Sequence, residues 1–263
     1  MDLGLKNRVA LVAASSKGLG KAIARGLAEE GAHLVMCARG EEALRSAERE
    51  IKSATGVEIL AMPVDVTKQD QVKTLVEQAI LRFGRIDILI NNAGGPPAGT
   101  FLDHSPEVWE KSFQLTFMST VYLCYEVIPY MQRQKWGRIL TITSVSVKQP
   151  VEGLITSNAI RSGVVGLTKT LATELAKDNI LVNNVCPGYI RTDRFLEVME
   201  SRAKRQGLPI EEVIASLEKT IPLGRVGEPK EFANMVIFLA SERADYITGA
   251  TIQIDGGVVK SLL

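Results

Sequence analysis

Residues 8–31 read RVALVAASSKGLGKAIARGLAEEG, and they join a short apolar run to an amphipathic run across a turn of small residues. The apolar, β-branched character of 8–14 predicts a buried strand. Leu19, Ile23 and Leu27 recur at helical spacing and predict a helix over 19–30. Gly31 is the residue type that commonly ends a helix. A strand, a turn of small residues and a helix in this order predict the start of a parallel βαβ unit.

The same alternation of strand-like and helix-like segments continues to the end of the chain. We expect further strands over 32–38, 57–63, 86–90, 137–143, 179–185 and 251–254, and helices over 41–54, from 68, over 106–134, 153–177 and 229–240, with a helical insertion at about 190–220. Thr67 and Asp70 have the spacing of a capping box for the helix from residue 68. Since parallel neighbours need crossover connections, the pattern predicts an α/β fold: residues 1–263 as a single-domain, doubly wound parallel sheet of about seven strands, with helices on both faces (Rossmann-type).

Composition excludes several classes of partner. The 263 residues carry 31 Lys plus Arg against 30 Asp plus Glu, so a net charge of +1 provides no field that would attract nucleic acid. Cys37, Cys124 and Cys186 are far apart and, with only His33 and His104, form no metal-ligand pattern. The start of the chain lacks a signal-peptide pattern, and no apolar run approaches the ~20 residues that span a bilayer. We expect a reduced, cytoplasmic protein with no metal and no membrane partner.

Unusual residues gather in the loops that follow the predicted strands, where a doubly wound sheet binds its ligands. Besides the first Gly-rich loop, these are Asp65-Val66, Asn91-Asn92-Ala93-Gly94, Ser144, Pro187-Gly188-Tyr189-Ile190-Arg191-Thr192, Ile247-Thr248-Gly249 and Asp255-Gly256-Gly257. Together they resemble the short-chain dehydrogenase/reductase family over essentially the whole chain. In overall pattern the resemblance is greatest to 3-oxoacyl thioester reductases.

This resemblance implies a nicotinamide dinucleotide site. Along the cofactor, from pyrophosphate through adenine and ribose to the nicotinamide carboxamide, the matching residues are Ser15, Ser16, Gly18, Leu19 and Gly20; Asp65 and Val66; Asn91, Ala93 and Gly94; and Pro187, Gly188, Ile190 and Thr192. The family's usual TGxxxGxG turn begins here with Ala13 and Ala14, so its first glycine carries a methyl group.

The second predicted strand ends in Cys37-Ala38-Arg39, without the acid that would accept from the ribose hydroxyls of NAD. Arg39 can offer a planar fork to a 2′-phosphate, and Lys17 adds a second positive charge. The alternative is that both are solvated surface cations. We expect NADP(H) rather than NAD(H).

The proton-transfer positions depart from the family pattern. Where the family has Asn, Ser, Tyr and Lys, this chain has Thr116, Ser144, Ser157 and Arg161. No tyrosine lies between residues 130 and 189, so a shifted alignment does not restore the missing phenol. A serine hydroxyl is a far weaker acid than a phenol, and an arginine stays protonated and does not relay a proton. Dienoyl-CoA reductases of the family also have Ser in place of Tyr, but they keep the Lys.

Two hypotheses of different class follow. The first is an NADP(H)-dependent oxidoreductase that acts on a carbonyl or conjugated enoyl small molecule with a non-standard proton donor, for which Tyr189, Lys148 and Cys186 are candidates. The second is a non-catalytic dinucleotide-binding sensor, regulatory subunit or partner. We favour the enzyme because Pro187, Gly188 and Thr192, whose evident use is to orient nicotinamide, are retained.

The predicted helices 106–134 and 153–177 correspond to the family's main dimer-forming pair. Their excess apolar residues are Phe117, Val121, Tyr125 and Ile128 on the first, and Val164, Val165 and Leu171 on the second. They indicate a homo-oligomer, a tetramer or a dimer. The insertion resembles the family's substrate lid, and its apolar residues are Phe195, Leu196, Val198, Met199 and Leu208. They leave the substrate's identity open.

Overall fold

The computed structural model describes residues 1–262, which build one seven-stranded sheet in the order β3-β2-β1-β4-β5-β6-β7. Its strands are β1 Val9–Val12, β2 His33–Ala38, β3 Ile59–Pro63, β4 Ile88–Asn91, β5 Gly137–Ile142, β6 Ile180–Pro187 and β7 Thr251–Ile254. Every neighbouring pair is parallel. The strand order reverses between β1 and β4, so the switch point of the predicted doubly wound sheet lies next to the first Gly-rich loop.

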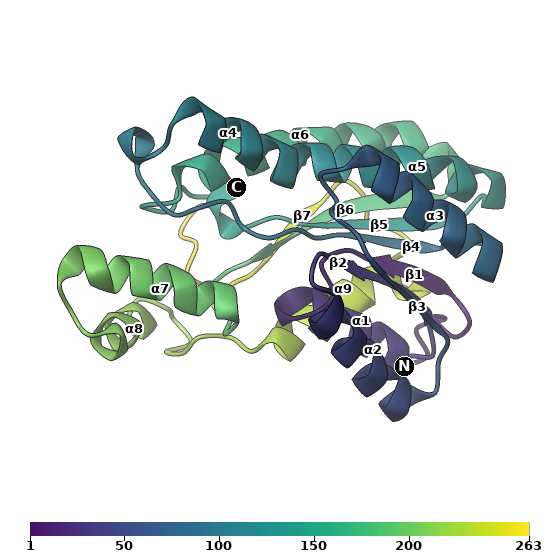
Figure 1. Cartoon of the computed structure of the whole chain (residues 1–263), viewed down its shortest axis with the longest axis horizontal. Coiled ribbons are helices and arrows are strands. Elements are labelled where there is room, and N and C mark those ends of the chain that lie inside the picture. The colour runs from purple at the N-terminus through teal and green to yellow at the C-terminus, as the bar shows by residue number, and fades with distance from the viewer. Residues whose placement is uncertain (263) are drawn as a thin grey trace.

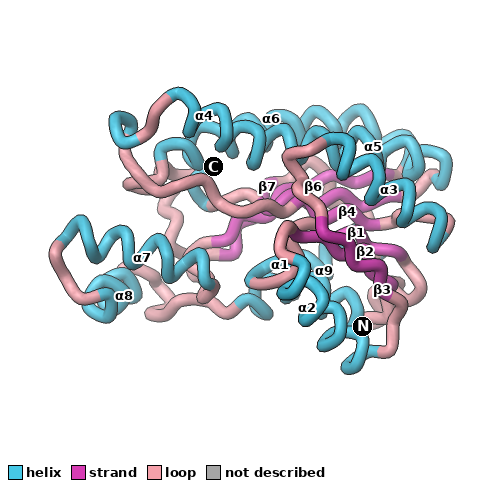
Figure 2. Tube along the Cα trace, viewed as in Figure 1, coloured by secondary structure: helices cyan, strands magenta, loops and turns pink. Residues whose placement is uncertain are grey.

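Helices cover both faces of the sheet (Figures 1 and 2). The helices of one face are α1 Gly18–Glu29, α2 Glu41–Thr55 and α9 Pro229–Ala240, and those of the other are α3 Gln69–Phe83, α4 Pro106–Phe113, α5 Ser119–Gln134 and α6 Ile155–Leu175. Each layer has its own buried cluster: Ile23, Leu44 and Phe232 belong to the first, and Val72 and Leu123 to the second. Within residues 1–262, none of these helices is long and apolar enough to cross a membrane.

Two local predictions need correction. The Thr67 hydroxyl donates to Asp65 Oδ1 at 2.8 Å instead of capping α3, and the N-cap residue Lys68 offers no side-chain cap. The predicted capping box is therefore wrong. The helix expected over 106–134 is present, but a π-helical segment, Gln114–Met118, interrupts it between α4 and α5. Such segments often occur at functional sites, and this one carries Thr116.

The expected helical insertion forms α7 Asp193–Gln206 and α8 Ile210–Glu218, which lie at one end of the sheet, apart from both helical layers (Figure 1). Phe195 and Met199 of α7 pack with Val213 of α8 in a separate buried cluster. Leu196 and Leu208 are exposed. The insertion thus contributes most of a small buried cluster that is separate from the two clusters along the sheet.

The helices expected to form an oligomer present part of the predicted apolar face. Tyr125 is 69% exposed, and Phe117 stacks on Phe113 with ring centroids 5.0 Å apart. Val164 is 1% exposed and belongs to the core, so its placement on an interface was wrong. Short 3-10 turns complete the chain at Phe101–Asp103, Val145–Val147, Ala176–Asp178 and Glu242–Ala244.

Candidate active site

A pocket of about 580 Å³ opens at the carboxyl ends of the strands, between the strand loops and α7. Most residues that the sequence assigned to the site line it: Ser16, Lys17, Gly18, Leu19, Arg39, Asp65, Val66, Ala93, Gly94, Ser144, Ser157, Arg161, Pro187, Gly188, Ile190 and Thr192. Loops from six strands thus converge on one pocket, as the doubly wound topology requires.

Four predicted residues stand behind the pocket wall instead. Ser15 is fully buried and donates its hydroxyl to Cys37 O at 3.4 Å. Gly20 lies under the first loop, where a Cβ would sit 2.2 Å from Ala14 O. The close approach of the two backbone segments therefore requires a glycine at this position. Asn91 and Thr116 are the other two, and neither lines this pocket.

Asn91 and Thr116 face a second, enclosed space of about 10 Å³ behind the pocket. Asn91 donates to Thr141 Oγ1 at 3.2 Å, while its Oδ1 and the Thr116 Oγ1 are buried without a hydrogen-bond partner. Arg161 also borders this space. Two unsatisfied acceptors in a space of this size fit roughly one ordered water molecule.

The first loop is shaped to receive an anionic group. Lys17 makes no side-chain cap at the start of α1, so the first N–H groups of that helix are free toward the pocket. No heavy atom lies within 4 Å of a Cβ built on Gly94, so the opposite wall is open. Ala14 has φ +48°, a left-handed conformation that favours glycine, and Asn92 Nδ2 braces the turn by donating to Ala13 O at 3.2 Å. The donor set and the open walls fit a dinucleotide.

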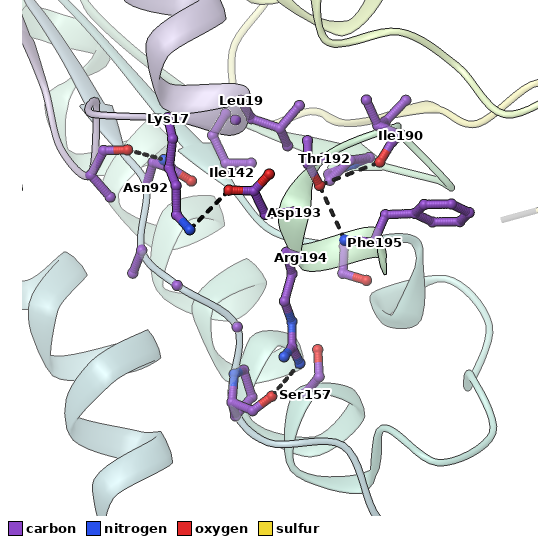
Figure 3. Close-up of a pocket in the computed structure, with 18 of the residues that line it drawn as sticks. Lys17, Leu19, Asn92, Ile142, Ser157, Ile190, Thr192, Asp193, Arg194 and Phe195 are labelled. Carbon is purple, nitrogen blue, oxygen red and sulfur yellow. Dashed lines mark hydrogen bonds and ion pairs between the residues drawn. The ribbon is translucent and has the colours of Figure 1, made fainter. Parts of the chain in front are cut away.

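The two cations at this end of the pocket differ in their pairing. Lys17 Nζ lies 2.9 Å from Asp193 Oδ2, and this hydrogen bond raises the pKa of Lys17. Figure 3 shows the pair bridging the first loop and the start of α7. Arg39 lines the pocket, is exposed and has no ion pair among residues 1–262. The cation that is free to meet a 2′-phosphate is therefore Arg39.

The retained Ser144 and the substituted Ser157 belong to a cluster of three hydroxyls. Ser144 Oγ accepts from the Ser146 N–H at 3.1 Å, and Ser146 Oγ lies 3.4 Å from Ser157 Oγ. Ser157 is 6% exposed. Sequence reasoning missed Ser146, although its two-residue spacing from Ser144 on a tight turn was the available signal.

Arg161 is a buried cation without an acidic partner. Its Nη1 donates to Ile142 O at 3.0 Å, and the residue is 8% exposed. Burial, with a smaller contribution from Arg194, lowers the pKa of Arg161 to about 10. In the described chain no carboxylate lies within 4 Å of its guanidinium. Since an unpaired buried charge is costly, this cation is suited to a negatively charged ligand or intermediate.

Among the candidate proton donors, Tyr189 has access to the pocket. It lines the wall and packs edge-on against Phe195, with ring centroids 6.4 Å apart. Cys186 is fully buried behind Thr143, and burial raises the pKa of its thiol. Lys148 lies outside the lining. Of the described lining residues, Tyr189 is the one phenol.

Arg194, in the first turn of α7, was not predicted as a site residue from the sequence. Its side chain extends from the helix toward Ser157, and its Nη2 donates to Pro96 O at 2.5 Å (Figure 3). A Cβ on Gly95 would lie 2.8 Å from Arg194 Nε, so the absence of a side chain there makes room for the guanidinium. The pocket therefore has two guanidinium groups near Ser157.

Comparisons with known proteins find similar chains over nearly the whole sequence. A family model described as "Enoyl-(Acyl carrier protein) reductase" matches residues 13–259. The chain is 36% identical to dehydrogenase/reductase SDR family member 4 of Bos taurus, covering 98% of this chain and 89% of that protein. It is 34% identical to the 3-oxoacyl-[acyl-carrier-protein] reductase FabG of Aquifex aeolicus, covering 98% and 100%. The structure of L-sorbose reductase from Gluconobacter frateurii, complexed with NADPH and L-sorbose, superposes over 100% of both chains with a TM-score of 0.94 and 36% identity.

Proposed function

The chain belongs to the short-chain dehydrogenase/reductase family, and from this premise we propose that it is an NADP(H)-dependent reductase of conjugated enoyl compounds. The observation that carries the proposal is the pairing of an intact cofactor end with a substrate end that has hydroxyls and a buried guanidinium but no phenol at position 157. Such a site stabilises a negative charge better than it delivers a proton.

The first loop and the start of α1 would hold the pyrophosphate, and Arg39 would meet the 2′-phosphate. Pro187, Gly188 and Thr192 would orient the nicotinamide. When bound, NADPH supplies a hydride and leaves as NADP⁺. The L-sorbose reductase structure with NADPH supports this choice of cofactor.

Ser144, Ser157 and Arg161 act on the substrate oxygen. When hydride adds to the β-carbon of an enone, the π electrons move onto the carbonyl oxygen and an enolate forms. The serine hydroxyls donate hydrogen bonds to that oxygen, and Arg161 stabilises its charge. A proton from solvent then adds at the α-carbon, so one hydride and one proton saturate the C=C bond.

An enolate is a much weaker base than the alkoxide that forms when hydride adds directly to a ketone. Hydrogen-bond donors and a fixed cation are therefore enough to stabilise it, whereas an alkoxide needs a positioned acid. This difference favours the enoyl substrate over the isolated carbonyl.

A second candidate function is reduction of an isolated carbonyl with Tyr189 as the acid. Its support is that Tyr189 is the phenol lining the pocket. The carbonyl reductases among the relatives, L-sorbose reductase and 3-oxoacyl-[acyl-carrier-protein] reductase, add to that support. Replacement of Tyr189 by Phe separates the two candidates, because the enoyl reaction does not need the phenol.

The insertion at 190–220 serves in this proposal as the substrate lid, since Val198 and Met199 line the pocket. We also expect a homo-oligomer built on the exposed face that holds Phe113, Phe117 and Tyr125. Light scattering checks this directly. A mass of two or four chains is the expected result, and a mass near 28.6 kDa would refute it.

Turnover of a matched pair of ketones tests the proposed function. Benzylideneacetone offers a conjugated C=C bond, and 4-phenylbutan-2-one is its saturated counterpart. We expect NADPH oxidation at 340 nm with the first and little with the second. Equal rates for both would favour the carbonyl reaction. Tight NADPH binding without oxidation across a broad enoyl panel would favour a non-catalytic dinucleotide-binding protein.

A further inference from the structure

Two positively charged groups face the substrate end of the pocket. Arg161 reaches it from α6, and Arg194 reaches it from α7 on the opposite side. Arg194 lies close enough to Arg161 that its charge adds to burial in lowering the pKa of Arg161. Like charges held together in a low-dielectric site repel, so the arrangement is favourable when an anion lies between them.

Acidic side chains do not neutralise this end of the pocket. The acids that line it are Asp65, which belongs to the predicted adenine end, and Asp193, which pairs with Lys17. Arg194 Nη1 does contact Glu197 Oε2 at 3.2 Å, but the Glu197 side chain is 58% exposed. A solvent-exposed pair of this kind is weak, so a ligand carboxylate can replace it.

Besides the arginines and the serine hydroxyls, many residues that line the pocket are apolar. They include Leu115, Val145, Leu154, Phe195 and Met199. A ligand that fits therefore combines an apolar body with one negative group.

We propose that the substrate is a small carboxylic acid with an apolar body, whose carboxylate binds the guanidinium of Arg194. Its reacting carbonyl oxygen faces Ser157 and Arg161. This assignment rests on the proposed function, because it deepens the substrate class of the same site. In this proposal α7 presents Arg194 to the acid, and the hydrogen bond from Arg194 to Pro96 O positions the guanidinium.

The phosphates of the cofactor are not the anion that we expect Arg194 to bind. In the proposed placement they lie against the first loop and Arg39, whereas Arg194 contacts Pro96 O and extends toward Ser157 (Figure 3). A planar fork at this position matches a carboxylate with two parallel hydrogen bonds.

Calorimetric titration of the NADP⁺-saturated protein with a matched pair of non-reducible ligands tests the proposal without turnover. The acid is 4-phenylbutyrate and its neutral partner is 4-phenylbutyramide. We expect the acid to bind about 10- to 100-fold more tightly, as one charge-assisted contact allows. Arg194→Gln should reduce this preference to about threefold or less.

Two further variants control for net charge. Lys204→Gln removes an exposed positive charge from the same helix, outside the pocket, and should keep the preference for the acid. Glu197→Gln frees Arg194 from its carboxylate partner and should increase the affinity for the acid several-fold. Thermal melting confirms that the variants are folded.

Equal affinities for the acid and the amide, absence of binding of both by the NADP⁺-saturated protein, or an unchanged preference in folded Arg194→Gln would overturn the proposal. NADP⁺ binding is measured first in the same titrations. Loss of cofactor binding would count against the proposed function itself, whereas failure of acid recognition with cofactor bound would count against this inference alone.

Discussion

The two ends of the pocket differ in their residues and in how their positively charged side chains are paired. At the cofactor end, the lining residues match the family pattern and Lys17 has Asp193 as a partner. At the substrate end, the sequence pattern places Ser157 and Arg161 where we expect the family's Tyr and Lys, and Arg161 is buried without a carboxylate partner among residues 1–262. The comparison teaches that the supply of hydride and the supply of a proton are separate tasks. In the proposed function, this chain keeps the groups for the first task and uses different groups for the second.

Restoring the family's residues at the substrate end should have the largest effect on activity, because both ends of the pocket would then carry the family pattern. We expect the triple variant Thr116→Asn, Ser157→Tyr and Arg161→Lys to raise reduction of 4-phenylbutan-2-one by a factor of ~10² to 10⁴, the usual contribution of a general acid. Single substitutions should give little, since the phenol and the lysine act together. Initial rates of NADPH oxidation measure this.

Two results would contradict that prediction. Rapid ketone turnover by the wild-type protein would mean that another group supplies the proton, and Tyr189→Phe would identify it. A triple variant that binds NADPH but stays inert on a wide ketone panel would mean that the substrate end is not a modified proton-transfer site.

Arg161→Met should separate activity from stability. We expect enoyl turnover to fall by about 10²-fold, because the enolate loses its fixed cation. The free energy of unfolding should rise by about 1–3 kcal/mol, since a buried, unpaired charge is replaced by an apolar chain of similar length. Denaturant titration at pH 7 measures the second effect, and a clear loss of stability would show that Arg161 has a partner we have not identified.

The pH dependence of that stability difference has a defined sign. Burial lowers the pKa of Arg161 to about 10 in the folded protein, below its ordinary value in the unfolded chain. Holding the charge therefore costs its full free energy below pH 10, and the cost fades as the pH rises above about 10 toward the ordinary pKa of arginine. The stability gain of Arg161→Met should be constant near neutral pH and should shrink above pH 10.

At the cofactor end, Lys17 is ion-paired with Asp193 and Arg39 is not, so we expect their substitutions to have unequal and smaller effects on cofactor binding. Arg39→Ala should weaken NADPH binding by about 1.5–3 kcal/mol and leave NADH binding unchanged, because the free guanidinium meets only the 2′-phosphate. Lys17→Ala should cost less, since Lys17 must first leave Asp193. Cofactor fluorescence titrations decide, and equal affinities for the two cofactors in the wild-type protein would refute the choice of NADP(H).

Ala14→Gly tests one of the two departures from the family's turn at the cofactor end, which are Ala13 and Ala14. Ala14 has φ +48°, where a Cβ is strained. Glycine relieves the strain but adds freedom to the unfolded chain, so we expect a net gain of about 1 kcal/mol or less. Thermal melting measures it. A lower melting temperature would mean that the methyl group packs favourably in the turn.

Much of the fold could be predicted from the sequence because periodicity sets each element locally. The helix at 229–240 and the strand at 251–254 have the predicted bounds. The π-helical segment at 114–118 could not be predicted, since its extra residue per turn depends on packing rather than on local pattern. The burial of Val164 could not be predicted either, since it depends on how α6 packs in the folded chain.

Site residues could be predicted from the sequence where they directly follow a strand. They could not be predicted where segments far apart in the sequence come together. Loop positions such as Ser144 and Pro187 follow from the topology. Arg194 reaches Pro96 across 98 residues, and the pairing of Lys17 with Asp193 crosses an even longer stretch of the chain. The positive charges of Arg194 and Lys17 do not by themselves indicate these contacts, because only the folded chain shows which cations have partners.

The position of transferred deuterium tests the central claim most directly. NADPH carrying deuterium at the transferable position would be incubated with benzylideneacetone and the protein, and the product would be analysed by NMR. We expect 4-phenylbutan-2-one with one deuterium at C4, the former β-carbon, and a proton from water at C3. Deuterium on the carbinol carbon of an allylic alcohol, or no transfer from bound NADPH to any enone tested, would contradict the account.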